Sequence, residues 1–137
     1  MRDDPFGNLT DWGGALHTLE KLSENGGLSE CQHGLVRILR YKGNWRLREE
    51  VLQRVGAVRA PSNELIQQVI SVLDDDNLYY DARIIAGNAL IQLLQNAESA
   101  GGDLHDRART VAEKLKSTPH PPFFHKALDR LHSAVYK

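Results

Sequence analysis

The sequence predicts an all-α protein of about seven helices, arranged as pairs that stack side by side. A helical motif at residues 44–55 returns at residues 77–90, with an offset of 35 residues taken from Arg48 to Arg83. Repeats of about 20 to 50 residues are typical of stacked supersecondary units. Apolar residues also recur at steps of three and four, the spacing of amphipathic helices, and no segment reads as a convincing strand.

The size and composition fit one globular domain spanning residues 1–137. The hydrophobic fraction is 41% and the charged fraction 26%, which is ordinary usage for a folded chain. Seventeen Lys and Arg residues against eighteen Asp and Glu residues give a net charge of -1. Bulk attraction to nucleic acid or to an acidic membrane is therefore not expected, and electrostatic recognition would need a local patch.

The first helix pair is expected at about residues 9–40. Five apolar residues at helical spacing define one face of its first helix: Trp12, Ala15, Leu16, Leu19 and Leu22. Gly26 and Gly27 should end this helix, because glycine readily takes the positive φ of a terminating residue. The second helix is predicted from about Leu28 to Arg40.

The second pair is expected at about residues 44–74. Asn44 can cap its first helix, because its side-chain oxygen can accept from N–H groups of the first turn. The inward residues of this helix are Leu47, Val51, Val55 and Val58. The partner helix follows Pro61 and has a broad apolar stripe, which predicts an inner helix: Leu65, Ile66, Val69, Ile70, Val72 and Leu73.

The third pair is expected at about residues 77–117, followed by a final helix at 121–136. Asp74 to Asp76 precede the pair, and its first helix carries an inward stripe of Ala82, Ile85, Ala89 and Leu93. Residues 99–102 should form a loop, with Asp103 as the cap of a helix through Leu104, Ala108, Val111 and Leu115. The final helix should bury Phe124, Leu128, Leu131 and Val135.

The repeated motif resembles the HEAT-repeat family of α-solenoids. The resemblance rests on Trp45-Arg46-Leu47-Arg48 followed by Val51, Leu52 and Val55, and on its echo Ala82-Arg83 followed by Ile85, Ala86, Ala89 and Leu90. It implies a right-handed α-α superhelix, here a short HEAT-like or armadillo-like solenoid. It also implies that Arg48 and Arg83 belong to a structural ladder between repeats, with Asp81 or the cluster Asp74 to Asp76 as partners.

The resemblance further implies a non-catalytic scaffold that binds another protein or peptide through the second helices of the pairs, on a concave face. The candidate contact residues are Gln32, His33, Arg37, Glu64, Gln67, Gln68, Ser71, His105 and Arg109. They mix donors, acceptors and both charge signs. Such a surface suits a peptide or folded partner better than a uniformly charged polymer.

The alternative hypothesis is a nucleic-acid-binding module. Residues 37–59 hold seven basic residues against Glu49 and Glu50, with aromatic residues between them that could stack on bases. The residues that would carry this binding are Arg37, Arg40, Lys42, Trp45 and Arg46. Convergence of these side chains on one groove would favour this hypothesis over the scaffold.

The sequence indicates no catalytic residue, cofactor site or metal site. His125 and His132 lie two helical turns apart, about 10 Å along the axis, which is too far for both to bind one ion. A single cysteine, Cys31, and the absence of a signal-like apolar segment predict a cytoplasmic location. No apolar run is long enough to span a membrane, and a monomer or weak homodimer is expected.

Overall fold

The computed structural model describes residues 4–97 and 102–135. Within these residues the regular secondary structure is all helical, with seven α-helices, one short 3₁₀ helix and no strand, which confirms the predicted all-α class. The elements are α1 (Trp12–Asn25), η1 (Gly27–Glu30), α2 (Gln32–Arg40), α3 (Trp45–Val55), α4 (Asn63–Leu73), α5 (Tyr80–Asn96), α6 (Gly102–Lys116) and α7 (Pro122–Val135). None of the described helices combines the length and the apolar character needed to cross a bilayer.

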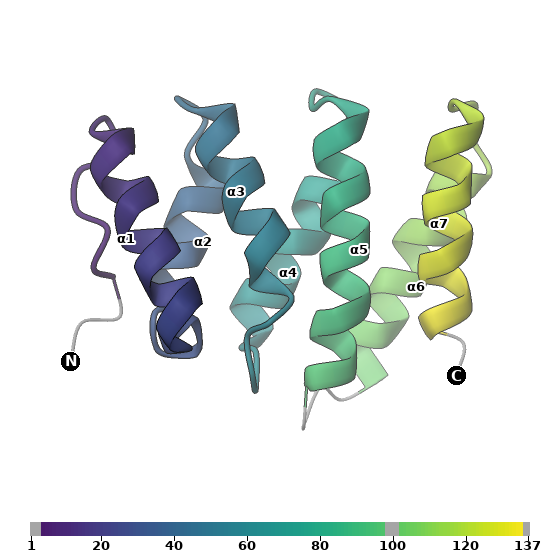
Figure 1. The fold of residues 1–137 in the computed structure, drawn as a ribbon. Coiled ribbons are helices and arrows are strands. Elements are labelled where there is room, and N and C mark those ends of the chain that lie inside the picture. Colours follow the sequence, from purple (N-terminus) through teal and green to yellow (C-terminus); the bar gives the residue numbers. More distant parts are fainter. Residues whose placement is uncertain (1–3, 98–101, 136–137) are drawn as a thin grey trace.

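The helices form two layers (Figure 1). One layer holds α1, α3, α5 and α7, which all begin at the upper edge of the view, and α2, α4 and α6 lie behind and run back toward that edge. The main contacts join helices that are one or two apart along the chain. The described helices therefore make an open row, with α1 and α7 at opposite ends, and not a closed bundle.

Side-chain and backbone caps set the ends of several helices. The Asn44 side-chain oxygen accepts from the N–H groups of Arg46 and Leu47 at 3.0 and 3.1 Å, so the predicted cap of α3 is confirmed. Gly26 ends α1 in the left-handed region, with φ of 77°, and its N–H donates to the Leu22 carbonyl. This is the conformation that glycine adopts without a Cβ penalty.

One apolar core runs through the row of helices. The stripes predicted for α4, α6 and α7 are buried throughout, as are the three α3 positions and Val58, which follows α3. The largest fully buried side chains are Phe124, Leu19, Leu35, Ile38, Leu39, Leu47, Leu52, Leu65, Ile66, Ile70, Leu73 and Leu90. Burying aliphatic side chains at about 25 cal/mol per Å² is the main force that holds the two layers together.

The predicted helix from Leu28 to Arg40 is wrong in one respect, because the chain breaks at Cys31. The Cys31 N–H donates to the Leu28 carbonyl at 3.0 Å, which closes a 3₁₀ turn and separates η1 from α2. Trp12 was expected to face inward but is exposed. It is the first residue of α1, one turn before the first buried residue of that helix, Ala15.

Two expectations for the third pair also need correction. Ile85 is only half-buried, because the buried face of α5 is centred on Arg83, Ala86 and Leu90. Asp103 lies in the first turn of α6 and is not its cap, since the helix already includes Gly102. The remaining residues of the expected loop, 99–101, lie outside the described residues.

A segment before α1 packs against the helices although no helical pattern marks it. Phe6 and Leu9 are buried in the common core. Phe6 lies directly on Gly34 of α2, where a Cβ atom would come within 2.6 Å of the Phe6 ring. A glycine at this position therefore permits the close approach between the segment and α2.

Candidate partner-binding surface

The residues predicted to contact a partner lie on α2, α4 and α6, which form one layer. Glu64, Gln67 and Ser71 follow one another at helical spacing on α4 and are exposed. His33 on α2 is exposed as well. The other members of the predicted set are half-buried: Gln32, Arg37, Gln68, His105 and Arg109.

The junction between α2 and α4 carries the clearest cross-helix contacts of this surface. The Arg40 Nε donates to the Gln68 side-chain oxygen at 2.8 Å, and its Nη2 lies 4.0 Å from the Glu64 carboxylate. The other Glu64 oxygen lies 3.7 Å from His33 Nε2. A pocket of about 370 Å³ opens here, lined by His33, Val36, Arg37, Arg40 and Glu64.

Two members of the predicted set, Arg37 and Gln32, make contacts within the fold. Arg37 donates to both Asp4 carboxylate oxygens, at 2.5 and 2.8 Å, and to the Gly7 carbonyl at 2.7 Å. The hydrogen bond from Arg37 holds the pKa of Asp4 below its ordinary value, although partial burial acts in the opposite direction. Arg37 thus fastens the segment before α1 to α2.

Gln32 also has a structural role, because its side chain connects η1 to the start of α4. Its side-chain nitrogen donates to the Ser29 carbonyl at 3.1 Å, and its oxygen accepts from the Ser62 N–H at 2.7 Å. On α6, Arg109 forms an ion pair at 2.6 Å with Asp106, one turn earlier. The surface available to a partner is therefore centred on α4 and the exposed part of α2.

The basic stretch is divided between the two layers. Arg40 and Lys42 line a pocket of about 140 Å³ together with Arg48, and Asp75 lies in the same pocket. Trp45 and Arg46 begin α3 in the other layer. Arg37 pairs with Asp4, and Arg54 pairs with Glu50 one turn earlier on α3. The cations predicted for nucleic-acid binding are thus interleaved with carboxylates. Arg37 and Arg40 line one pocket and Arg40 and Lys42 line another, whereas Arg46 lines neither of the two.

Arg48 and Arg83 occupy the same position, the fourth residue of α3 and of α5, and both are buried at 7% and 2% exposure. The Arg83 Nε donates to the Leu73 carbonyl at 2.9 Å, and its Nη2 lies 3.4 Å from an Asp76 oxygen. Its guanidinium carbon stands 4.7 Å from the centre of the Phe124 ring. Of the carboxylates named as candidate ladder partners, Asp76 is the one that contacts Arg83.

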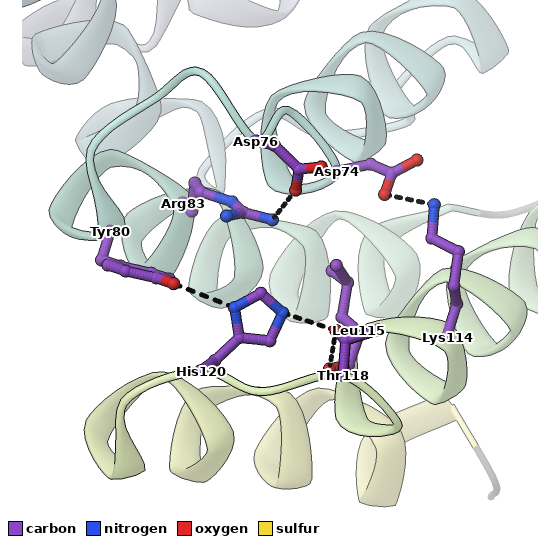
Figure 2. A pocket seen from close by; sticks show the side chains of 8 residues that line it. All are labelled: Asp74, Asp76, Tyr80, Arg83, Lys114, Leu115, Thr118 and His120. Atoms are coloured by element: carbon purple, nitrogen blue, oxygen red, sulfur yellow. Dashed lines mark hydrogen bonds and ion pairs between the residues drawn. The ribbon is translucent and has the colours of Figure 1, made fainter.

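Arg83 forms part of a polar pocket of about 460 Å³ between the α4–α5 turn and the α6–α7 turn (Figure 2). Its lining residues are Asp74, Asp76, Tyr80, Arg83, Lys114, Leu115, Thr118 and His120. Lys114 pairs with Asp74 at 2.6 Å, and His120 lies between the Tyr80 hydroxyl at 3.0 Å and the Thr118 hydroxyl at 2.8 Å. These contacts connect the two turns.

The sequence did not identify His120 as a residue of this pocket. Partial burial lowers its pKa, and the positive charge of Arg83 lowers it further. It follows a proline and belongs to no helical stripe, and its contact with Tyr80 spans 40 residues, so no local pattern marks it.

Comparison of the chain with protein-family models, curated proteins and solved structures finds no match.

Proposed function

We propose that this chain is a non-catalytic protein-binding scaffold built of HEAT-like repeats, arranged as a short right-handed α-α superhelix. The equivalent burial of Arg48 and Arg83 supports a repeated unit, since each is the fourth residue of its helix. The two-layer row of antiparallel helices is the arrangement that such repeats would produce. The proposed binding face is the outer surface of α2, α4 and α6.

The observation that carries the proposal is the mixed polar surface at the α2–α4 junction. Arg40, His33 and Glu64 supply both charge signs around a pocket of about 370 Å³, and Val36 adds an apolar floor. Surfaces that combine a small apolar area with donors and acceptors of both signs are typical of protein interfaces. A peptide or a folded protein domain is therefore the proposed partner.

Nucleic-acid binding is the second candidate, favoured by Trp45, Lys42 and Arg46, which are exposed at the start of α3 and the turn before it. A phosphate backbone following this surface would meet Asp75 in the neighbouring pocket. Binding to nucleic acid depends on many uncompensated cations and falls steeply with salt. The interleaved carboxylates therefore make this candidate the weaker one.

A site-specific photo-cross-linker tests the proposed face in a lysate of the source cells. We would place a photoreactive amino acid at Gln67, which is exposed on α4, and the same amino acid at Gln53, which is exposed on α3 in the other layer. Both positions replace an exposed glutamine in a helix, so the two variants are matched. We expect a discrete protein adduct from position 67 and not from position 53.

A charge reversal then checks whether the adduct depends on the proposed surface. Glu64→Lys removes the carboxylate that faces His33 and Arg40, so it should abolish the adduct from position 67. Exposed surface substitutions usually change stability by less than about 0.5 kcal/mol, so the fold should persist. Equal adducts from positions 67 and 53, or adducts sensitive to nuclease, would contradict the proposed face.

A further inference from the structure

Arg48 is a buried cation without a partner in the described part of the chain. Its exposure is 7%, and its side chain forms no hydrogen bond or ion pair with any described residue. No described side-chain nitrogen or oxygen is fully enclosed without a hydrogen-bond partner, so the Arg48 nitrogens keep contact with solvent. Arg48 lines the pocket of about 140 Å³, which gives its charge that access. A buried charge without a partner is costly to the fold, and such costs are typical of binding sites.

Arg83 occupies the same position of the next repeat and has the partners that Arg48 lacks. It donates to the Leu73 carbonyl and pairs with Asp76 in the turn before α5. The offset of 35 residues sets 40–42, Arg-Tyr-Lys, against 75–77, Asp-Asp-Asn. The turn before α3 therefore carries basic residues where the turn before α5 carries carboxylates.

The pocket beside Arg48 is positively charged. Its lining contains Arg40, Lys42 and Arg48 against one carboxylate, that of Asp75, which gives a net charge of +2. Lys42 is exposed and, like Arg48, its side chain pairs with no described residue. An Asp75 oxygen accepts from the Asn77 N–H at 2.9 Å, so this carboxylate is engaged in its own turn.

The two glutamates that follow Arg48 in the sequence do not neutralise its charge. Glu50 pairs with Arg54, one turn later on α3. Burial raises the pKa of Glu49, and the charge of Arg48 opposes this rise, although no ion pair joins these two described residues. Neither glutamate lines the pocket. The positive charge therefore remains available to an anion that enters from solvent.

The size and charge of the pocket suit a phosphate group. A water molecule takes up about 30 Å³ of liquid, so a volume of about 140 Å³ holds roughly five groups of that size. This is enough for the oxygens of a phosphate monoester and too little for an aromatic ring as well. A phosphate monoester carries about -1.5 to -2 charges at neutral pH, which matches the lining, whereas a carboxylate would leave about one positive charge uncompensated.

The pocket adjoins the proposed scaffold face. Gln68 and Ser71 of α4 belong to its lining, and Arg40 lines both this pocket and the one of about 370 Å³. The Arg40 Nε donates to the Gln68 side-chain oxygen at 2.8 Å, which fixes Arg40 between the two pockets. A peptide that crosses the α2–α4 junction would meet both. A nucleic-acid backbone needs a longer series of cations, and the second pocket contains Glu64.

We propose that the pocket beside Arg48 binds the phosphate group of a phosphorylated serine or threonine in a protein partner. Arg48 would donate to two phosphate oxygens, because the planar guanidinium matches them, and Lys42 and Arg40 would balance the remaining charge. The phosphate would act on Arg48 as Asp76 acts on Arg83. That the phosphate belongs to a protein rests on the proposed scaffold function, whereas the anion site rests on the pocket itself.

Fluorescence anisotropy of labelled peptide pools tests the proposal on the full chain. The probe is a pool of short peptides with a central phosphoserine and random flanking residues, and the matched pools carry serine or glutamate at the centre. We expect saturable binding of the phosphoserine pool, tighter than that of either matched pool by about tenfold or more. Inorganic phosphate should compete only at much higher concentration, because it lacks the contacts of the peptide.

Variants locate the phosphate on the chain. Arg48→Met and the exposed Lys42→Gln should each weaken binding of the phosphoserine pool, the first by about tenfold or more. Asp75→Asn should tighten it, because the amide removes a negative charge and keeps an oxygen for the Asn77 N–H. Arg46→Met is the matched control: it is exposed on α3, lines neither pocket and should leave binding unchanged.

Urea unfolding separates binding from a structural role of Arg48. Replacement of an unpartnered buried charge by an apolar side chain of similar length should leave the midpoint of Arg48→Met equal to that of the native chain or higher. The phosphoserine pool should raise the midpoint of the native chain and not that of the variant. A lower midpoint for the unliganded variant would show that the fold depends on this charge and would contradict the proposal.

Other results would also overturn the proposal. Equal binding of the phosphoserine and serine pools, or unchanged binding by Arg48→Met, would remove the phosphate site. Inorganic phosphate that binds as tightly as the phosphoserine pool would make free phosphate the ligand, and a thymidine oligonucleotide that binds more tightly would make it nucleic acid. Loss of the adduct from position 67 with phosphopeptide binding intact would contradict the scaffold face alone.

Discussion

Arg83 is a buried cation that contacts one carbonyl, one exposed carboxylate and two aromatic rings. Its guanidinium stands over Phe124 and 5.5 Å from the centre of the Tyr80 ring. The side chain of Asp76 is 85% exposed, so this ion pair contributes less than about 1 kcal/mol. The hydrogen bond to Leu73 and the contact with the rings should account for most of the stabilisation.

We therefore predict that Arg83→Ala lowers the free energy of unfolding by about 2 to 4 kcal/mol, because it leaves a buried carbonyl unpaired and opens a cavity. Arg46→Ala, an exposed substitution on α3, should cost less than about 0.5 kcal/mol. Urea unfolding of both variants measures the difference. Equal and small losses would remove the structural role assigned to Arg83.

His120 gives the pocket between the two turns a dependence on pH. Its folded-state pKa lies below the ordinary value of about 6.5, so the unfolded chain binds more protons in that range. The stabilisation linked to His120 is therefore complete above that value and is lost as pH falls toward the folded pKa. Contacts with the Tyr80 and Thr118 hydroxyls hold the ring in place.

His120→Gln should make the urea midpoint less dependent on pH between about 7 and 5 than in the native chain. The matched control is His17→Gln, because His17 is exposed on α1, remote from the pocket. That variant should keep the native pH dependence. Identical pH profiles for the His120→Gln variant and the native chain would contradict the assignment.

The segment before α1 is not helical, and its contacts with α2 hold it in place. Phe6 packs on Gly34, and Asp4 binds Arg37 through both carboxylate oxygens. A methyl group at position 34 would collide with the Phe6 ring, and overpacking of this kind costs about 1 to 3 kcal/mol. The helix itself tolerates alanine, so the cost falls on the contact.

Gly34→Ala should therefore expose the segment before α1 and lower stability by about 1 to 3 kcal/mol. Hydrogen exchange of the Phe6 amide, which donates to an Asp4 oxygen at 3.2 Å, measures release of the segment. Gly13→Ala is the control, because a Cβ at position 13 of α1 meets nothing within 4 Å. If the Gly34→Ala variant keeps native exchange at the Phe6 amide, the contact with Phe6 does not hold the segment.

The sequence predicts the elements whose apolar residues follow a helical period and misses those that do not. The cap at Asn44 and the buried stripes of α4 and α7 follow from local spacing. Phe6 and Leu9 lie on either side of Gly7 in a non-helical segment, so no period marks them. The break at Cys31 is equally invisible, because the residues around it suit a helix.

The sequence predicts the polar outer face of the helices better than it predicts which residues at the helix starts are exposed. The outer face of α2, α4 and α6 follows from which residues of each helix are polar. The exposure of the aromatic residues at the helix starts, Trp12, Trp45 and Phe123, depends on where each helix begins, which the period of the apolar residues does not report. Trp12 shows the difference, because its spacing matches the inward stripe whereas its place at the helix start leaves it exposed.

At the scale of the whole molecule, α1 and α7 stand at opposite ends of the row and are connected only through the helices between them. In stacked units of this kind, stability is approximately a sum of local terms and nearest-neighbour interfaces. Leu19 on α1 and Leu131 on α7 are both fully buried, so they offer equivalent positions at the two ends. Removal of either side chain should cost about 2 to 5 kcal/mol.

The loss of stability should be confined to the helices near the end where the leucine is removed. We predict that Leu131→Ala accelerates native-state hydrogen exchange mainly in α5, α6 and α7, because α7 contacts both α5 and α6. Leu19→Ala should accelerate it mainly in α1 and α3, which gives each variant the other as its control. A uniform increase along the chain in both variants would mean that the row unfolds as one unit, and that its interfaces transmit a loss at one end to the other.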